Sequence, residues 1–182
     1  SIGYFDSLYV EIVIVIGMLL SSLPFTLYIA ASRKNYSIFD DSQVLTFFII
    51  VLFFTTILSI WLHFQNNIDF LISFRLALFN GVSLMTGTGY TTENFSHWGS
   101  FSSGLLLIMM LIGGCSGSTT GGLKIFRVQL ILMIILKELK KIKSPRAVFA
   151  LHYKGKIINE EIINPAMIML LLFFFSIFLI TF

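Results

Sequence analysis

The sequence predicts an all-α polytopic membrane protein with a span–pore helix–span arrangement. Three observations support this fold class: apolar stretches long enough to cross a bilayer, a shorter apolar stretch followed by a Gly/Thr-rich segment, and very little charge. Of the 182 residues, 57% are hydrophobic and 12% are charged, whereas soluble domains are usually about 25% charged. A soluble helical domain of this composition would have too few polar residues to cover its surface.

The first two long apolar stretches are predicted spans. Residues 8–30 form the first, and Pro24 is expected to kink it because proline removes a backbone hydrogen bond. Residues 44–64 form the second. Both are long enough, since a helix needs about 20 apolar residues to cross a hydrocarbon core about 30 Å thick. Glu11, near the start of the first span, is interpreted as an interfacial carboxylate.

The third apolar stretch differs from the first two in length. Residues 71–85 number only 15, which is short for a span and suits a re-entrant helix. The following TGTGYTTENFSHWGS has no helical pattern. A span, a short helix, an extended return and another span make a pore loop, in which backbone carbonyls replace the hydration shell of an ion. The predicted ion-binding filter residues are Thr86, Gly87, Thr88 and Gly89.

The next apolar region is interrupted by a polar decamer. Residues 101–136 would form a helix about 54 Å long if it were unbroken, which exceeds one crossing. We therefore expect one crossing that is interrupted near the middle of the bilayer, where non-helical backbone must be buried in protein or line a water-filled cavity. The residues of this predicted loop are Gly113, Gly114, Cys115, Ser116, Gly117, Ser118, Thr119, Thr120, Gly121 and Gly122.

Individual residues in and after the decamer admit more than one interpretation. GCSG fits the G-x-S-G pattern of intramembrane serine proteases, so a serine hydrolase with Ser116 as nucleophile is the alternative function. No histidine is predicted at mid-membrane to serve as its base. Cys115 is interpreted as a small packing residue. Lys124 and Arg127 either face an interior or extend to the inner membrane surface.

The distribution of charge predicts the orientation of the spans. Basic residues gather in two polar segments, 31–43 and 137–163, and basic loops remain in the cytoplasm. Segment 65–100 is expected outside; it contains a single basic residue, Arg75, which is expected at the outer interface. Because the basic residues flank apolar spans, they mark membrane topology and give no support to nucleic-acid binding.

The end of the chain is predicted to begin a further span. Residues 164–182 are apolar, and Pro165 is expected in the first helical turn, where proline is tolerated. The sequence contains one cysteine, so a disulfide within the chain is excluded.

Three motifs resemble a known family. MTGTGY, GGCSGSTTGGLKIFRV and the opening SIGYF are similar to the membrane subunit of Trk-type bacterial potassium-uptake systems, the TrkH/KtrB superfamily. The resemblance covers the whole chain. SPRAVFALHYKGKIINEEII is similar to the segment before the last repeat in the TrkH branch, which favours that branch. Gly87 stands where a threonine is more usual in the family's third filter.

The resemblance implies a potassium-channel-like transporter with four span–pore helix–span repeats around one pore, of which this chain is a partial copy. On that plan the chain divides into the closing span of repeat two (1–36), a complete repeat three with filter and broken closing span (37–137), a cytoplasmic connector (138–163) and the start of repeat four (164–182).

The resemblance also implies what the chain does. It implies potassium uptake across the cytoplasmic (inner) membrane, with K⁺ as the transported ion at residues 86–89 and with no organic cofactor. The loop 113–122 would be a gate beneath the filter. The implied partners are a second copy of the protein, a cytoplasmic nucleotide-binding regulatory subunit of the TrkA type, and the lipid bilayer. A transporter rather than an enzyme is expected.

Overall fold

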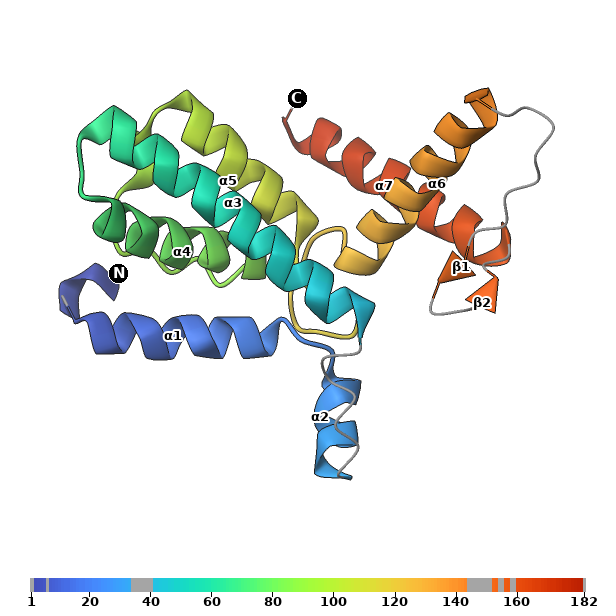
Figure 1. Ribbon diagram of the computed structural model, residues 1–182, viewed down its shortest axis with the longest axis horizontal. Helices are drawn as coiled ribbons and strands as arrows, with labels where there is room; N and C mark the ends of the chain where they lie inside the picture. Colours follow the sequence, from blue (N-terminus) through green and yellow to red (C-terminus); the bar gives the residue numbers. More distant parts are fainter. Residues whose placement is uncertain are drawn as a thin grey trace. The chain divides into compact units, whose positions relative to one another are not determined.

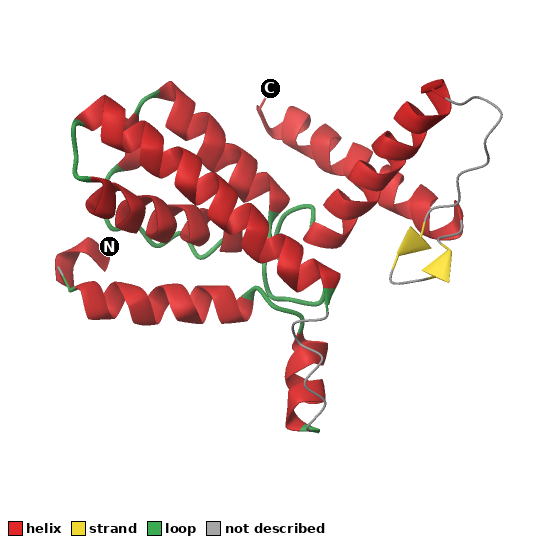
Figure 2. Ribbon diagram, in the orientation of Figure 1, coloured by secondary structure: helices red, strands yellow, loops and turns green. Residues whose placement is uncertain are grey.

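The computed structural model describes residues 2–5, 7–33, 41–143, 152–153, 156–157 and 160–181. Most of this described chain is α-helical, as the sequence predicts (Figures 1 and 2). A hairpin of two short antiparallel strands, β1 (His152–Tyr153) and β2 (Lys156–Ile157), is a small departure from an all-α fold. The chain divides into two compact units, Ser1–Ile125 and Phe126–Phe182.

The helices follow one another along the chain with short connections. Their bounds are η1 (Ile2–Phe5), α1 (Leu8–Ser21), α2 (Phe25–Ser32), α3 (Ser42–Asn66), α4 (Phe70–Thr86), η2 (Phe95–Trp98), α5 (Ser100–Ile112), α6 (Ile125–Lys143) and α7 (Glu160–Thr181). η1 and η2 are short 3₁₀-helices, and η2 falls within the segment for which no helix was predicted.

The first predicted span is broken rather than kinked. α1 and α2 meet at an angle of 93°, and α2 leaves the end of α1 almost at right angles (Figure 1). Pro24 occupies the position just before α2 with an extended backbone, φ −63° and ψ 131°. Proline has no N–H to continue the α1 ladder, and it disfavours helix in the residue before it, so α1 ends and α2 starts anew.

Three helices of the first unit pack together, and α1 lies against one of them. α3, α4 and α5 contact one another, while α1 contacts α4 (Figure 1). α3 contributes a stripe of buried residues at helical spacing, namely Val44, Phe47, Val51, Thr55, Leu58, Ser59 and Leu62. Among the described residues, α3 is long and apolar enough to cross a membrane, and the bent pair α1–α2 passes the same test if it counts as one span.

The predicted short helix and the predicted interruption are both present. α4 extends the expected 71–85 by one residue at each end. The interruption between α5 and α6 is longer than the predicted decamer, because the non-helical backbone continues from Gly113 to Lys124. Lys124 adopts φ +72°, a left-handed conformation that does not continue a helix.

The second unit corrects one prediction about the last span. α7 begins at Glu160, four residues before the predicted start, so Pro165 lies inside the helix and not in its first turn. Leu130 of α6 and Ala166 of α7 belong to one buried apolar cluster. Most of the predicted connector between residues 144 and 159 lies outside the described residues, as does the junction predicted near residue 36.

Candidate functional site

The predicted filter begins at a tight turn that ends α4. Gly87 has φ +75°, and its N–H donates to Leu84 O at 3.2 Å. The N–H of Thr88 donates to Ser83 O at 3.1 Å. This pair of hydrogen bonds is a Schellman motif, which satisfies the last carbonyls of a helix and needs a residue that tolerates positive φ. The departure from the family pattern at Gly87 therefore suits the turn.

After this turn the chain runs back beside α4. Asn80, in the middle of α4 and 1% exposed, donates through Nδ2 to Thr92 Oγ1 at 2.9 Å. Its Oδ1 accepts from the N–H of Thr92 at 3.4 Å. Thr88 contacts Ser83, and Thr92 contacts Asn80, so the return segment travels against the helix direction. Asn80 had no predicted role, although an amide within an apolar helix was an available signal.

The structure places the four predicted filter residues together at the end of α4. Thr86 is the last helical residue and is buried, so the extended segment starts one residue later than predicted. Gly87, Thr88 and Gly89 are exposed in this chain, and Gly89 has φ +73°. The Thr88 hydroxyl donates to Met18 Sδ of α1 at 3.0 Å, which ties the segment to a second helix.

The predicted mid-membrane loop, residues 113–122, is compact and is cross-linked by its own hydrogen bonds. Ser118 Oγ donates to Cys115 O at 2.6 Å and lies 2.8 Å from Thr120 Oγ1. Thr120 Oγ1 also accepts the N–H of Gly114 at 3.1 Å. The end of the loop is tied to α5, where Leu123 N–H donates to Leu111 O at 2.9 Å. The Ser and Thr hydroxyls thus satisfy backbone groups inside the loop, as expected of non-helical backbone away from water.

The same loop fills the break between α1 and α2. The N–H of Cys115 donates to Ser22 O at 3.0 Å, and the N–H of Phe25 donates to Gly117 O at 3.0 Å. Thr119 Oγ1 donates to Ser21 O at 3.1 Å. A helix end leaves carbonyls and amides without intrahelical partners. Here two helix interruptions that lie far apart in the sequence satisfy one another.

A third helix also holds the loop. Gln43, in the first turn of α3, accepts the N–H of Ser116 at Oε1 over 3.2 Å. The thiol of Cys115 is 3.7 Å from the backbone carbonyl of Gln43 and is fully buried, which confirms that Cys115 packs in the interior. Gln43 was not singled out by the sequence, because nothing local distinguishes it from Gln65 at the other end of α3.

Three glycines of the loop are required by the close approach of neighbouring atoms and not only by their conformational freedom. A Cβ on Gly113 would lie 2.2 Å from Gly121 O, and one on Gly114 would lie 2.5 Å from Thr120 Oγ1. A Cβ on Gly122 would lie 2.9 Å from Leu111 O, and Gly122 also has φ +79°. At Gly121 a Cβ would meet nothing within 4 Å.

Lys124 turns toward the loop. Its ammonium donates to the carbonyls of Thr120 and Ser118, the latter at 3.4 Å. Of the two interpretations of this lysine, the structure supports an interior contact. Arg127, in the first turn of α6, is half-buried.

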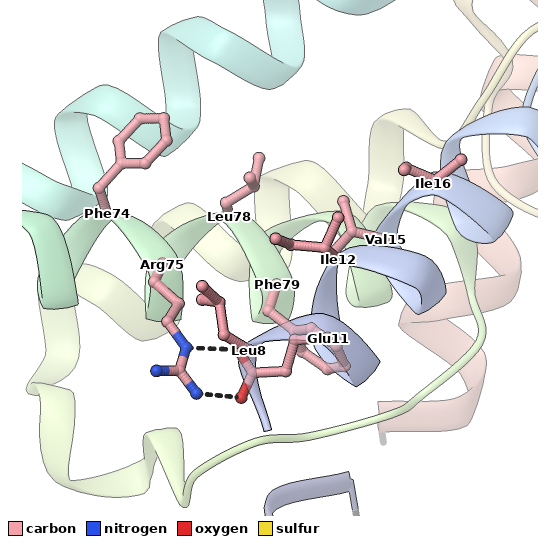
Figure 3. A pocket seen from close by; sticks show the side chains of 9 residues that line it. All are labelled: Leu8, Glu11, Ile12, Val15, Ile16, Phe74, Arg75, Leu78 and Phe79. Carbon is pink, nitrogen blue, oxygen red and sulfur yellow. Dashed lines mark hydrogen bonds and ion pairs between the residues drawn. The ribbon is translucent and has the colours of Figure 1, made fainter. Parts of the chain in front are cut away.

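Two charged residues that the sequence treated separately form a pair. Arg75 of α4 donates from Nε to Glu11 Oε2 at 2.6 Å and from Nη2 to Glu11 Oε1 at 2.8 Å (Figure 3). The carboxylate of Glu11, interpreted from the sequence as interfacial, is therefore also a partner of α4. A largely apolar pocket of about 350 Å³ lies between α1 and α4 beside this pair (Figure 3).

Comparison with known proteins places this geometry in context. The family model TrkH, described as a cation transport protein, matches residues 1–182. The Trk system potassium uptake protein TrkH of Vibrio parahaemolyticus serotype O3:K6 (strain RIMD 2210633) is 34% identical over 170 residues, covering 90% of this chain and 35% of that protein. The Trk system potassium uptake protein TrkG of Escherichia coli (strain K12) is 31% identical over 166 residues, covering 90% and 34%.

A solved structure shares the fold. The crystal structure of the potassium transporter TrkH from Vibrio parahaemolyticus has a TM-score of 0.85 and 32% identity, covering 92% of this chain and 37% of that one. The chain spans about a third of the length of the curated relatives it matches. The family and these relatives are transporters by name and not enzymes, so the serine hydrolase alternative with Ser116 receives no support.

The close approaches in the loop give a first prediction. Gly113→Ala should lower the melting temperature of the purified protein, because its Cβ would meet Gly121 O and its φ is +71°. The strained conformation alone costs about 1–3 kcal/mol. Gly121→Ala is the matched control, since its Cβ meets nothing within 4 Å. Equal melting temperatures for the two variants in detergent would contradict the described packing.

Proposed function

The chain belongs to the TrkH family of cation transport proteins, as its motifs indicate, and on this premise we propose that it forms part of a pore for potassium uptake across the cytoplasmic membrane. The observation that carries the proposal is the return of the chain after α4: a short helix, a left-handed turn at Gly87 and an extended segment that Asn80 fixes at Thr92. Because it belongs to this family, the chain is a membrane protein. Its place in the cytoplasmic membrane is part of the proposal.

The filter acts through the backbone of residues 86–89. A dehydrated K⁺ needs a ring of oxygens in place of water, and four pore loops around one axis supply it. This chain contributes one of the four on the proposed plan, in which 1–36 closes repeat two, 37–137 is repeat three, 138–163 is a connector and 164–182 opens repeat four. The hydrogen bonds to Ser83 and Asn80 of α4 and to Met18 of α1 hold the segment on the side of these two helices.

The loop 113–122 is the proposed gate. It is non-helical, it joins α5 to α6, and most of the contacts that hold it are hydrogen bonds, to Ser21, Ser22 and Gln43. A bonded arrangement of this kind has discrete alternatives, because each amide and carbonyl can exchange its partner for another or for water. In the proposed cycle the loop occludes the pore below the filter and withdraws when a regulator acts.

The proposed assembly is a homodimer with a cytoplasmic nucleotide-binding regulatory subunit of the TrkA type. The C-terminal part of α6 supports this contact, because KELKKIK presents several basic side chains. Lys140 is exposed, while Lys141 is paired with Glu138 at 2.9 Å. Basic residues at a helix end attract an acidic surface on a partner, and added salt weakens this attraction by screening the charges.

The filter proposal is tested at Gly89. Gly89→Val in the full-length protein should lower the preference for rubidium over sodium by about tenfold, the equivalent of about 1.4 kcal/mol, because a valine resists φ +73° and the carbonyls shift. The measurement is the ratio of rubidium to sodium uptake into liposomes.

Gly104→Val of α5 is the matched control for this change. A Cβ at Gly104 meets nothing within 4 Å, and its φ is not positive. The control should keep the parent's ion ratio. An unchanged ratio in Gly89→Val would remove residues 86–89 from the filter.

The gate proposal is tested at Gln43. Gln43→Ala removes the acceptor for Ser116 N–H, so we expect higher rubidium flux in the absence of the regulator and an unaltered ion ratio. An increase of about fivefold corresponds to about 1 kcal/mol, the usual net value of one hydrogen bond. Gln65→Ala makes the same change in an exposed position of α3 and should leave the flux as in the parent. If both variants stay closed and regulated, the gate lies elsewhere.

The partner proposal is tested by co-purification. Neutralising Lys140, Lys141 and Lys143 together to glutamine should reduce the amount of regulatory subunit that remains bound, and raising the salt should do the same to the parent protein. The regulator is quantified against the membrane subunit on the same gel. Complete retention by the triple variant at raised salt would show that these charges do not form the contact.

A further inference from the structure

We infer that Glu11 and Arg75 are a positioning pair for the filter: their ion pair fixes the register of α1 along α4 and thereby the place of Thr88. This inference rests on the proposed filter at residues 86–89. It assigns a role in ion selectivity to two charged side chains that do not themselves belong to the filter.

The pair is bidentate and therefore holds α1 and α4 in one relative position; we call it the joint. The guanidinium of Arg75 presents two nitrogens to the two oxygens of Glu11, at 2.6 and 2.8 Å. Such a fork constrains direction as well as distance. The side chain of Glu11 is 8% exposed and that of Arg75 is 36% exposed, so the joint lies on the face of α1 that contacts α4.

One face of α1 carries both the joint and a contact to the filter. The buried residues of α1 are Glu11, Val15 and Met18, spaced by four and three positions. This spacing places them in one row. Met18 lies about 10 Å along the helix from Glu11 and accepts the Thr88 hydroxyl at 3.0 Å. A shift of α1 along α4 would therefore move the filter contact by the same amount.

Apolar packing beside the pair does not fix this register alone. A pocket of about 350 Å³ lies between α1 and α4, lined by Ile12, Ile16, Phe74 and Leu78 among others (Figure 3). Side chains around such a space tolerate sliding, whose natural step is one turn, about 5.4 Å. The fork between Arg75 and Glu11 has only one satisfied register.

The energetics of ion pairs favour a role in fixing the register of α1 over a role in stabilising the fold. Burying the carboxylate of Glu11 is costly, and an ion pair with a partly exposed partner such as Arg75 adds little net stability. What the pair adds is discrimination between registers, because a slipped helix would break both hydrogen bonds of the fork.

The test separates the effect of the position of α1 from the effect of the charges of Glu11 and Arg75. Glu11→Gln with Arg75→Gln leaves the summed charge at this point unchanged and abolishes the fork. We expect the rubidium-to-sodium uptake ratio of the full-length protein in liposomes to fall by about tenfold, within the range usual for coupling between separate sites. Glu11→Asp, which keeps both charges and withdraws the carboxylate by one methylene, should lower the ratio less and in the same direction.

A matched control changes an exposed position of α3. Gln65→Ala removes a polar side chain that lies outside the filter, the loop and the ion pair, and it should keep the parent's ratio. A ratio of two fluxes from one preparation does not depend on how much protein is folded, so a loss of stability alone leaves it unchanged.

The outcomes are distinct. A parent-like ratio in both the double glutamine variant and Glu11→Asp overturns the positioning role, as does a double variant that fails to fold while Glu11→Asp keeps the parent's ratio. A parent protein that does not prefer rubidium over sodium contradicts the proposed filter, and with it the basis of this inference. A lowered ratio in Glu11→Asp beside an unaffected Gln65→Ala control supports the pair.

Discussion

Backbone amides and carbonyls that leave a helix within a membrane must find partners inside the protein, because hydrocarbon offers none. In this chain two helices are interrupted, at Ser22–Pro24 and at Gly113–Lys124, and each interruption supplies partners for the other. Cys115 donates to Ser22, and Phe25 donates to Gly117. Either break alone would leave backbone amides and carbonyls without these partners. The right-angled turn of α1–α2 and the loop after α5 are therefore one structural feature.

This mutual dependence shapes how the loop could move. Its glycines at 113, 114 and 122 permit contacts that a Cβ would prevent, so the loop is closely fitted to its surroundings. Its hydroxyl side chains, however, and the amide of Gln43 in α3 make hydrogen bonds of modest net strength. A loop of this type is well defined in one state and is still able to exchange partners for another. Gly-rich sequence here serves fit first and mobility second.

The proposed filter segment is held by hydrogen bonds from within the protein in a related way. Two polar residues of α4 bind the returning chain: Ser83 contacts Thr88, and Asn80 contacts Thr92. Met18 of α1 accepts a further hydrogen bond from Thr88. These contacts occupy the side of the segment toward α4 and α1, while Gly87, Thr88 and Gly89 remain exposed on this chain. The geometry of this segment thus depends on α4 and on α1, and α1 ends at the 93° break that the loop fills.

The sequence by itself determined the bounds of α3 and α4 and the place of the interruption after α5, because apolar length and periodicity are local properties. α3, α4, the non-helical turn at Gly87 and the break after Ile112 were all predicted within one or two residues. The family was also predictable, since its motifs are contiguous. The positions of the filter and loop residues in the chain were therefore known in advance, although their roles remain proposals.

Only the tertiary structure decided which polar groups meet. The pairing of Glu11 with Arg75, of Asn80 with Thr92 and of Gln43 with Ser116 joins residues up to 73 positions apart, and nothing in their own neighbourhoods specifies the partner. The same holds for Pro24: proline predicts a disturbance, but a full 93° break requires a loop from elsewhere to satisfy the exposed backbone. Hydrogen bonds and ion pairs over such separations depend on how the helices pack, which no local pattern encodes.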